Sequence, residues 1–199
     1  CGGYFRSNPS LMWPDQQLYF NPVTYTTTPS GTRSIVNTDP FPGFIIGFNQ
    51  SRPTSRGHIH IRSNDAADQP LISPRYLTTN EDCQSVIAGG RLCRDFTMTN
   101  SLKTLIDTPF VSDINSMSDE DILEDFRQRS GTVFHPVGTC RMGRDAKTAV
   151  VDSKLRVFGI EGLRVADASV FPNITSANTN APTMMVAWRA VDLIREERA

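Results

Sequence analysis

The chain has 199 residues, of which 38% are hydrophobic and 21% charged, a composition typical of a globular protein with one or two domains. Its formal net charge is −1, so the composition excludes the strongly basic proteins that bind nucleic acid or an anionic membrane surface. No apolar run approaches the roughly 20 residues that span a bilayer, and we therefore expect no membrane span.

The four cysteines are scattered and form no C-x-x-C pair, which disfavours a zinc or dithiol site. Cys83 and Cys93 are predicted to share one helix, which places them roughly 15 Å apart, too far for a disulfide. We therefore expect reduced thiols and a cytoplasmic location.

The first 78 residues are predicted to be rich in β-structure. We expect a short strand over 17–20 and a second over 43–48 that is apolar enough to be central in a sheet. Residues 57–62 alternate between polar and apolar side chains, which predicts one buried and one solvated face. The prolines around 70–74 limit that segment to a short edge strand.

Helices are predicted to follow. Asn80 has the character of an N-cap, and the helix behind it is expected to reach about Leu105. Gly89 and Gly90 would weaken this helix by about 1 kcal/mol each relative to alanine, unless close packing requires them. A second helix is predicted to open at Ser118 and to run to about Arg129.

The C-terminal third is predicted to contain two short strands and a final helix. The strands cover 155–158 and 163–166, on either side of Gly159 and Gly162. The helix is expected to begin near Pro182, a residue favoured in the first turn.

Three motifs near the C-terminus carry the functional information. They are His-Pro-Val-Gly-Thr-Cys-Arg-Met-Gly at 135–143, Gly-Leu-Arg-Val-Ala-Asp-Ala-Ser at 162–169 and Asn-Thr-Asn-Ala-Pro-Thr-Met-Met at 178–185. In this order and spacing they resemble the C-terminal signature of the glucose-methanol-choline (GMC) family of flavin oxidoreductases, nearest its choline-dehydrogenase-like alcohol dehydrogenase branch. That family opens with a Gly-rich dinucleotide fingerprint, and no G-x-G-x-x-G occurs in this sequence.

The resemblance extends over the whole chain and implies an α+β fold. Residues 1–130 resemble the family's substrate-binding domain, an antiparallel sheet backed by helices. Residues 131–199 resemble the strand-helix segment that carries the catalytic motifs and returns to the FAD-binding domain, on which 163–168 and the final helix pack. The missing N-terminal FAD-binding half is therefore an expected partner. Apolar surface left open without it would favour a homo-oligomer.

The resemblance also implies roles for individual residues. His135 matches the catalytic histidine beside the flavin N5, and Asn180 matches the second active-site position. The residues that it places against FAD are Asp167, Ala168, Asn178, Pro182 and Thr183. An imidazole can accept the hydroxyl proton of an alcohol near neutral pH, and a neutral amide can stabilise the developing alkoxide. The flavin takes the hydride, since no side chain can.

Simpler interpretations of these residues remain open. On composition alone a histidine such as His135 is structural or at the surface. Asn180 could be a turn or cap residue, and Asp167 could cap a strand-to-loop turn.

Other kinds of site have weaker support. His58 and His60 could share a metal ion, but no third ligand is apparent, so a solvated strand face is the better interpretation and no metal site is predicted. A hydrolase triad of His135, Asp167 and Ser169 lacks a G-x-S-x-G elbow, and Cys140 as a nucleophile has no better support.

Two hypotheses follow. The first is an FAD-dependent oxidoreductase that transfers hydride from the CH–OH group of a small-molecule alcohol to flavin N5, with His135 as general base. The second is a truncated, catalytically inactive substrate-domain module. On this view the 199 residues bind no FAD on their own, because the pyrophosphate has no glycine-rich turn to receive it.

Overall fold

The structure, a computed structural model, describes residues 1–25 and 38–198. The chain divides into two compact units. Unit 1 consists of residues 1–51 and 80–132, and unit 2 of residues 52–79 and 133–199. The predicted division into a substrate-binding domain (1–130) and a segment with the catalytic motifs (131–199) concerns function and stays a prediction. Over the described residues, no helix combines the length and the apolar character needed to cross a membrane.

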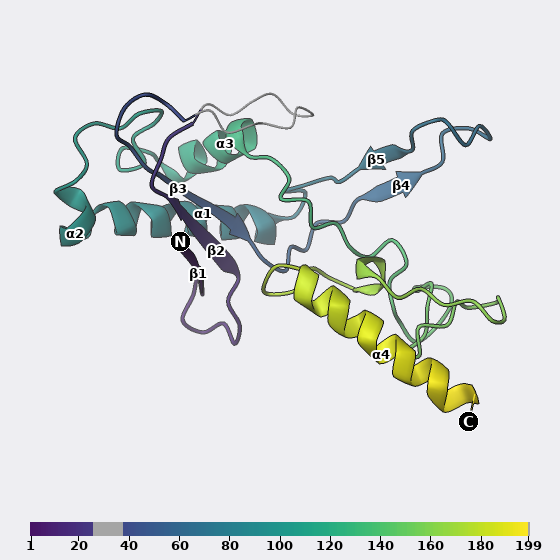
Figure 1. Ribbon diagram of the computed structural model, residues 1–199. Coiled ribbons are helices and arrows are strands. Elements are labelled where there is room, and N and C mark those ends of the chain that lie inside the picture. The colour runs from purple at the N-terminus through teal and green to yellow at the C-terminus, as the bar shows by residue number, and fades with distance from the viewer. Residues whose placement is uncertain (26–37, 199) are drawn as a thin grey trace. The chain divides into compact units, whose positions relative to one another are not determined.

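Unit 1 contains an antiparallel sheet in the order β1-β2-β3 (Figure 1). Its strands are β1 (Gly2–Phe5), β2 (Gln16–Asn21) and β3 (Ile45–Gln50). The prediction that the apolar segment 43–48 is central was wrong: among the described strands β2 is central and β3 is at the edge. The apolar character of β3 has another cause, since Phe48 packs against helix α1 (Asn80–Thr97) at Gly89.

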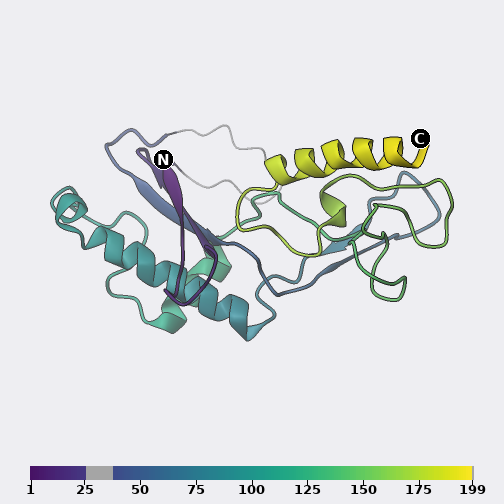
Figure 2. The same ribbon diagram turned by 90° about the horizontal axis from the view of Figure 1, so that it is seen from below.

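Helix α1 crosses the sheet and contacts both β3 and α3 (Asp119–Arg129) (Figures 1 and 2). A Cβ added to Gly89 would lie 2.4 Å from Phe48 Cδ2, and one added to Gly90 would lie 2.3 Å from Ile122 Cγ2. Close packing therefore requires glycine at both positions, which is the exception that the sequence analysis gave for this pair. The core of this unit includes the buried residues Leu18, Val86, Ile87, Cys93 and Ile122.

The ends of these helices refine the predictions. Helix α1 begins at Asn80 itself, so this residue is in the first turn and not the cap before it. It ends at Thr97 and does not reach Leu105; the short α2 (Asn100–Lys103) follows. The Thr97 hydroxyl donates to the carbonyl of Arg94 at 2.8 Å and so satisfies an acceptor at the helix end.

Helix α3 begins directly after Ser118, where the sequence predicted a helix to open. The Asp121 N–H donates to Ser118 Oγ at 3.1 Å, and the Ser118 N–H donates to Asp121 Oδ2 at 2.9 Å. These two bonds form a capping box. Hydrogen bonds from the Ser118 backbone and side chain lower the pKa of Asp121, which keeps the carboxylate ionised.

Unit 2 contains a two-stranded antiparallel ribbon of β4 (His58–His60) and β5 (Leu71–Ser73). The short strand predicted over 70–74 is confirmed. The prediction of one buried face over 57–62 was wrong, because all three residues of β4 are exposed. Alternation alone cannot bury a face, which also requires a second layer to pack against it.

The core of unit 2 lies between helix α4 (Asn180–Arg198) and the looped segment 140–171 (Figure 2). Its buried members are Val151, Leu155, Val170, Val186, Ala190 and Leu193. The last three recur on one face of α4 at helical spacing. Val170 belongs to the 3-10 turn η1 (Ala168–Val170), which fixes the end of the second motif in this core.

The prediction of two short strands in unit 2 needs correction. The strands predicted over 155–158 and 163–166 exist only as isolated bridges, Arg156 with Arg164 and Val157 with Val151. Gly159 and Gly162 have φ of +76° and +72°. The chain therefore turns back within a few residues, and residues in this turn cannot extend the pairing of two strands. Helix α4 begins at Asn180, so the predicted start near Pro182 is confirmed.

Candidate active site

The centre of the candidate site is the imidazole of His135, which is half-buried and contacted through both ring nitrogens. Its Nε2 lies 2.9 Å from Asn178 Nδ2, and its Nδ1 lies 3.0 Å from Thr179 Oγ1. Two residues that directly precede α4 therefore hold the ring from both sides. Two hydrogen bonds at fixed positions orient an imidazole and select its tautomer.

The backbone around His135 places this ring. Phe134 has φ of +59°, a conformation that is costly for a residue with a Cβ, and its side chain is 82% exposed. Gly138 has φ of +89°, and a Cβ there would approach the Phe171 carbonyl oxygen at 3.3 Å. The turn between them directs Phe134 outward and His135 inward toward 178–179.

The first and second motifs are joined by backbone hydrogen bonds. The Cys140 N–H donates to the Ser169 carbonyl at 3.0 Å, and the Met142 N–H donates to the Val170 carbonyl at 2.8 Å. Because Val170 is fully buried in the core of unit 2, this pairing fixes the histidine motif to a rigid part of the fold.

Asp167 caps the 3-10 turn η1. Its Oδ1 accepts a hydrogen bond from the Ser169 N–H at 2.8 Å. Hydrogen bonds from the Ser169 side chain and backbone lower the pKa of Asp167. The carboxylate is therefore ionised at neutral pH and presents its remaining lone pairs at the surface, next to Ala168.

The third motif forms the start of α4. The Thr179 carbonyl accepts from the Thr183 N–H at 3.0 Å and from Thr183 Oγ1 at 2.7 Å. Pro182 is the third helical residue, where its missing N–H costs nothing because the first N–H groups of a helix have no partner within the helix. Asn180 is exposed beside it.

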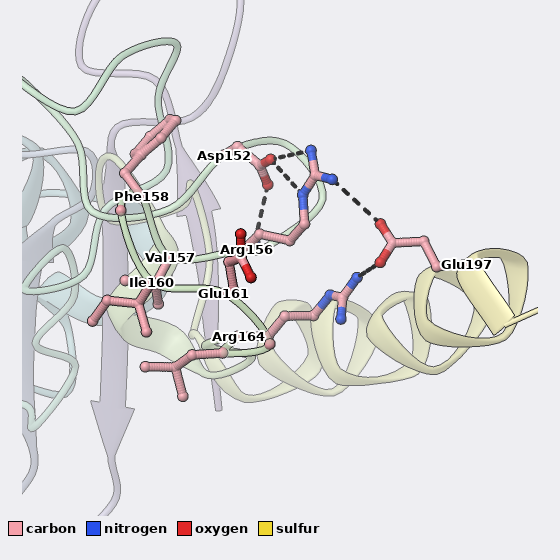
Figure 3. Close-up of a pocket in the computed structure, with 11 residues that line it drawn as sticks. Asp152, Arg156, Val157, Phe158, Ile160, Glu161, Arg164 and Glu197 are labelled. Atoms are coloured by element: carbon pink, nitrogen blue, oxygen red, sulfur yellow. Dashed lines mark hydrogen bonds and ion pairs between the residues drawn. The ribbon is translucent and has the colours of Figure 1, made fainter.

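A charged pocket of about 500 Å³ lies at the other end of α4 (Figure 3). Arg156 lies between Asp152, at 2.7 Å, and Glu197, at 3.6 Å, and Arg164 reaches the same Glu197. The Arg164 hydrogen bond, together with nearby positive charges, lowers the pKa of Glu197. These charged groups pair with one another. The ion pairs to Glu197 connect the looped segment 140–171 to the C-terminal end of α4.

One face of α4 is apolar and exposed. Trp188 is 78% exposed, and Met184, Met185 and Val191 are exposed on the same helix. Met184, Met185 and Trp188 line a second pocket. The helix is thus apolar both toward its own core and away from it, which is typical of an element covered on both sides.

His58 and His60 face each other with ring centroids 4.7 Å apart, and both are exposed. Within the part of the chain that the structure describes, no group of three or more histidine, cysteine or acidic side chains could hold a metal ion. The arrangement fits a solvated strand.

Comparison with known proteins identifies the family. The GMC oxidoreductase model of the C-terminal domain matches residues 53–187. The chain belongs to the GMC oxidoreductase family. The alcohol dehydrogenase (acceptor) of Pseudomonas putida is 38% identical over 97% of this chain and 34% of its own length. The oxygen-dependent choline dehydrogenase of Citrobacter koseri is 36% identical over 98% of this chain and 34% of its own length.

Solved structures agree. The pyridoxine 4-oxidase from Mesorbium loti matches with a TM-score of 0.78 and 26% identity, over 98% of this chain and 37% of that one. A formate oxidase from Aspergillus oryzae, described in work on its FAD modification, matches with a TM-score of 0.79 and 27% identity, over 94% and 32%. These matches confirm the predicted α+β class. The GMC chain described here spans about a third of the length of the curated relatives it matches.

The predicted site residues of this GMC chain fall in unit 2. The structure brings Asn178 to the His135 ring, whereas Asn180 has no hydrogen bond to that ring among the described contacts. Thr179 was missed. Its signal in the sequence was its position between Asn178 and Asn180, directly before a helix.

Proposed function

We propose that this chain takes part in the FAD-dependent oxidation of the CH–OH group of a small-molecule alcohol, with His135 as the general base. The observation that carries the proposal is the fixed imidazole, held at Nε2 by Asn178 and at Nδ1 by Thr179. A base must be oriented before it can accept a proton at a defined point, and such proton transfer contributes about 10²–10⁴-fold in rate.

The chemistry of the surrounding residues fits FAD. The ionised Asp167 accepts hydrogen bonds, so it suits the ribityl hydroxyls, whereas a pyrophosphate beside it would be repelled. Ala168 adds a small side chain beside it. Asn178 lies just before the start of α4, and Pro182 and Thr183 lie in its first turns, where the partial positive charge of a helix N-terminus suits an anionic ring. When bound, FAD supplies the two-electron acceptor that side chains lack.

The chain's own residues have two tasks in this proposal. His135 accepts the hydroxyl proton at the nitrogen that Asn178 contacts, so the substrate hydroxyl takes the place of that amide. Asn180, exposed at the first residue of α4, donates a hydrogen bond to the substrate oxygen as its negative charge develops. Choline and simple primary alcohols are the substrates to test first, because relatives are named for these reactions.

The exposed apolar face of α4 is suited to bind an apolar surface of a partner. We propose that Met184, Met185 and Trp188 pack against the FAD-binding part found in the other two thirds of the relatives. Pairing of two copies of the chain is the alternative. If the FAD-binding part is required, the 199 residues alone retain no flavin and oxidise nothing.

The test combines cofactor binding and turnover. The chain alone, and the chain placed in the corresponding third of the Pseudomonas putida relative, are mixed with FAD and passed through gel filtration, and flavin absorbance is recorded. For whichever form retains flavin, His135→Ala is expected to lower choline or alcohol oxidation about 10²–10⁴-fold. His60→Ala, an exposed histidine on β4, is the matched control. Equal activity of His135→Ala and wild type would refute the assignment of the base.

A further inference from the structure

We propose that Thr179 is a positioning residue that keeps the ring proton of His135 on Nδ1 and thereby leaves the lone pair on Nε2. The Thr179 hydroxyl oxygen lies 3.0 Å from Nδ1, and the Asn178 amide nitrogen lies 2.9 Å from Nε2. The tautomer follows from these contacts alone. Only its consequence for catalysis rests on the proposed function.

The two contacts together select one tautomer. An amide nitrogen carries two hydrogens and accepts none, so a ring nitrogen that it contacts must be the acceptor. A neutral imidazole has one donor and one acceptor, and therefore Nδ1 carries the hydrogen. The Thr179 hydroxyl can accept that hydrogen. In the opposite tautomer an Nε2–H would point at the N–H of Asn178, and the two hydrogens would repel each other.

Thr179 is well suited to hold this position. Thr179 is buried, with 7% of its surface exposed. Two hydrogen bonds from Thr183 fix its carbonyl at the start of α4. A hydroxyl directly before a helix usually accepts from the N–H of the second or third helical residue. Here the third residue is Pro182, which has no N–H. The proline therefore removes one of the two usual donors to this hydroxyl.

The tautomer decides which atom of His135 is basic. A neutral histidine can accept a proton only at its unprotonated nitrogen. With Nδ1–H bound to the buried Thr179, that nitrogen is Nε2, on the side of Asn178, which is exposed. Thr179 thus acts on the base and not on a substrate.

The test is nuclear magnetic resonance of the full 199-residue chain labelled with nitrogen-15 in histidine. Correlations between ring nitrogens and carbon-bound hydrogens separate protonated from unprotonated nitrogen, and the chain has three histidines, so His135→Gln assigns the signals. At about pH 8, where an unperturbed histidine is neutral, we expect the Nδ1–H form in wild type and in Thr179→Ser. In Thr179→Val the ratio should shift about fivefold or more toward Nε2–H, the factor that one net hydrogen bond provides.

Thr148→Val is the control for loss of a threonine hydroxyl in the same unit, and its tautomer ratio should equal that of wild type. An Nε2–H ring in wild type, or an unchanged ratio in Thr179→Val, overturns the proposal. If the valine variant does not fold, Thr179→Ala takes its place with the same expectation. Because the spectrum requires no turnover, a correct tautomer together with equal activity of His135→Ala and wild type in the flavin-retaining form would count against the proposed function only.

Discussion

The contact between α1 and α3 at Gly90 predicts a stability change opposite to that expected from helix propensity. In an open helix, Gly90→Ala would stabilise by about 1 kcal/mol. Here the new Cβ would lie 2.3 Å from Ile122 Cγ2 and 3.3 Å from its Cδ1. Cγ2 is attached directly to the branched Cβ of a buried side chain, so it cannot move away by a simple rotation. Overpacking of this kind costs about 1–3 kcal/mol. After subtraction of the propensity gain of about 1 kcal/mol, we expect a net loss of about 1 kcal/mol in the free energy of unfolding.

The assay is urea denaturation followed by circular dichroism, with hydrogen exchange of the peptide 119–129 to assign the transition to unit 1. The matched control is Gly47→Ala on β3, where a Cβ meets nothing within 4 Å. This control is expected to be neutral or to stabilise by up to about 1 kcal/mol. A Gly90→Ala variant that is more stable than wild type would refute the reasoning, because it would mean that α3 moves aside at little cost.

Three further predictions follow from other parts of the chain. Burial raises the pKa of the Cys93 thiol to about 12, so its alkylation at mildly alkaline pH should be at least about a hundredfold slower than that of the exposed Cys1; equal labelling by peptide mass spectrometry would contradict this. Ser118→Ala should cost about 1 kcal/mol at neutral pH. The Ser118 backbone and side chain both lower the folded-state pKa of Asp121, and the variant loses the side-chain bond; that part of the cost is present above the unfolded pKa and is lost as pH falls through the folded value, so a thermal-unfolding difference that stays constant into acid would refute it. Glu197→Gln should speed hydrogen exchange in the last turn of α4 severalfold, and high salt should do the same to wild type; unchanged exchange would show that the ion pairs are not needed there.

Local signals in the sequence predicted local structure well. Helix α3 opens at Ser118 as predicted, and the prolines around 70–74 limit β5 as expected. The tolerance of Gly89-Gly90 was correctly tied to packing. What failed depended on distant partners. The alternation over 57–62 describes a strand with two different faces, but whether one of them is buried depends on a layer supplied elsewhere in the chain.

The candidate site shows the same limit. Motifs identified His135, Asp167 and Asn178, which carry polar groups of recognisable chemistry. The role of Thr179 depends on a contact with a ring 44 residues away, and on the backbone pairing of Cys140 with Ser169 that fixes the histidine motif. Neither contact has a periodicity or a spacing that a sequence reveals.

The division of the chain has a consequence for its synthesis and for its dissection. Each unit is made of two separate stretches, because residues 52–79 leave unit 1 and belong to unit 2. On a ribosome, the β4–β5 ribbon is made long before residues 133–198, with which it forms a unit. No single cut separates the units, so expressing either as one continuous piece would carry along a segment of the other or leave one of its own behind. Exchange between relatives is therefore expected to succeed with the 199 residues together and to fail with either half alone.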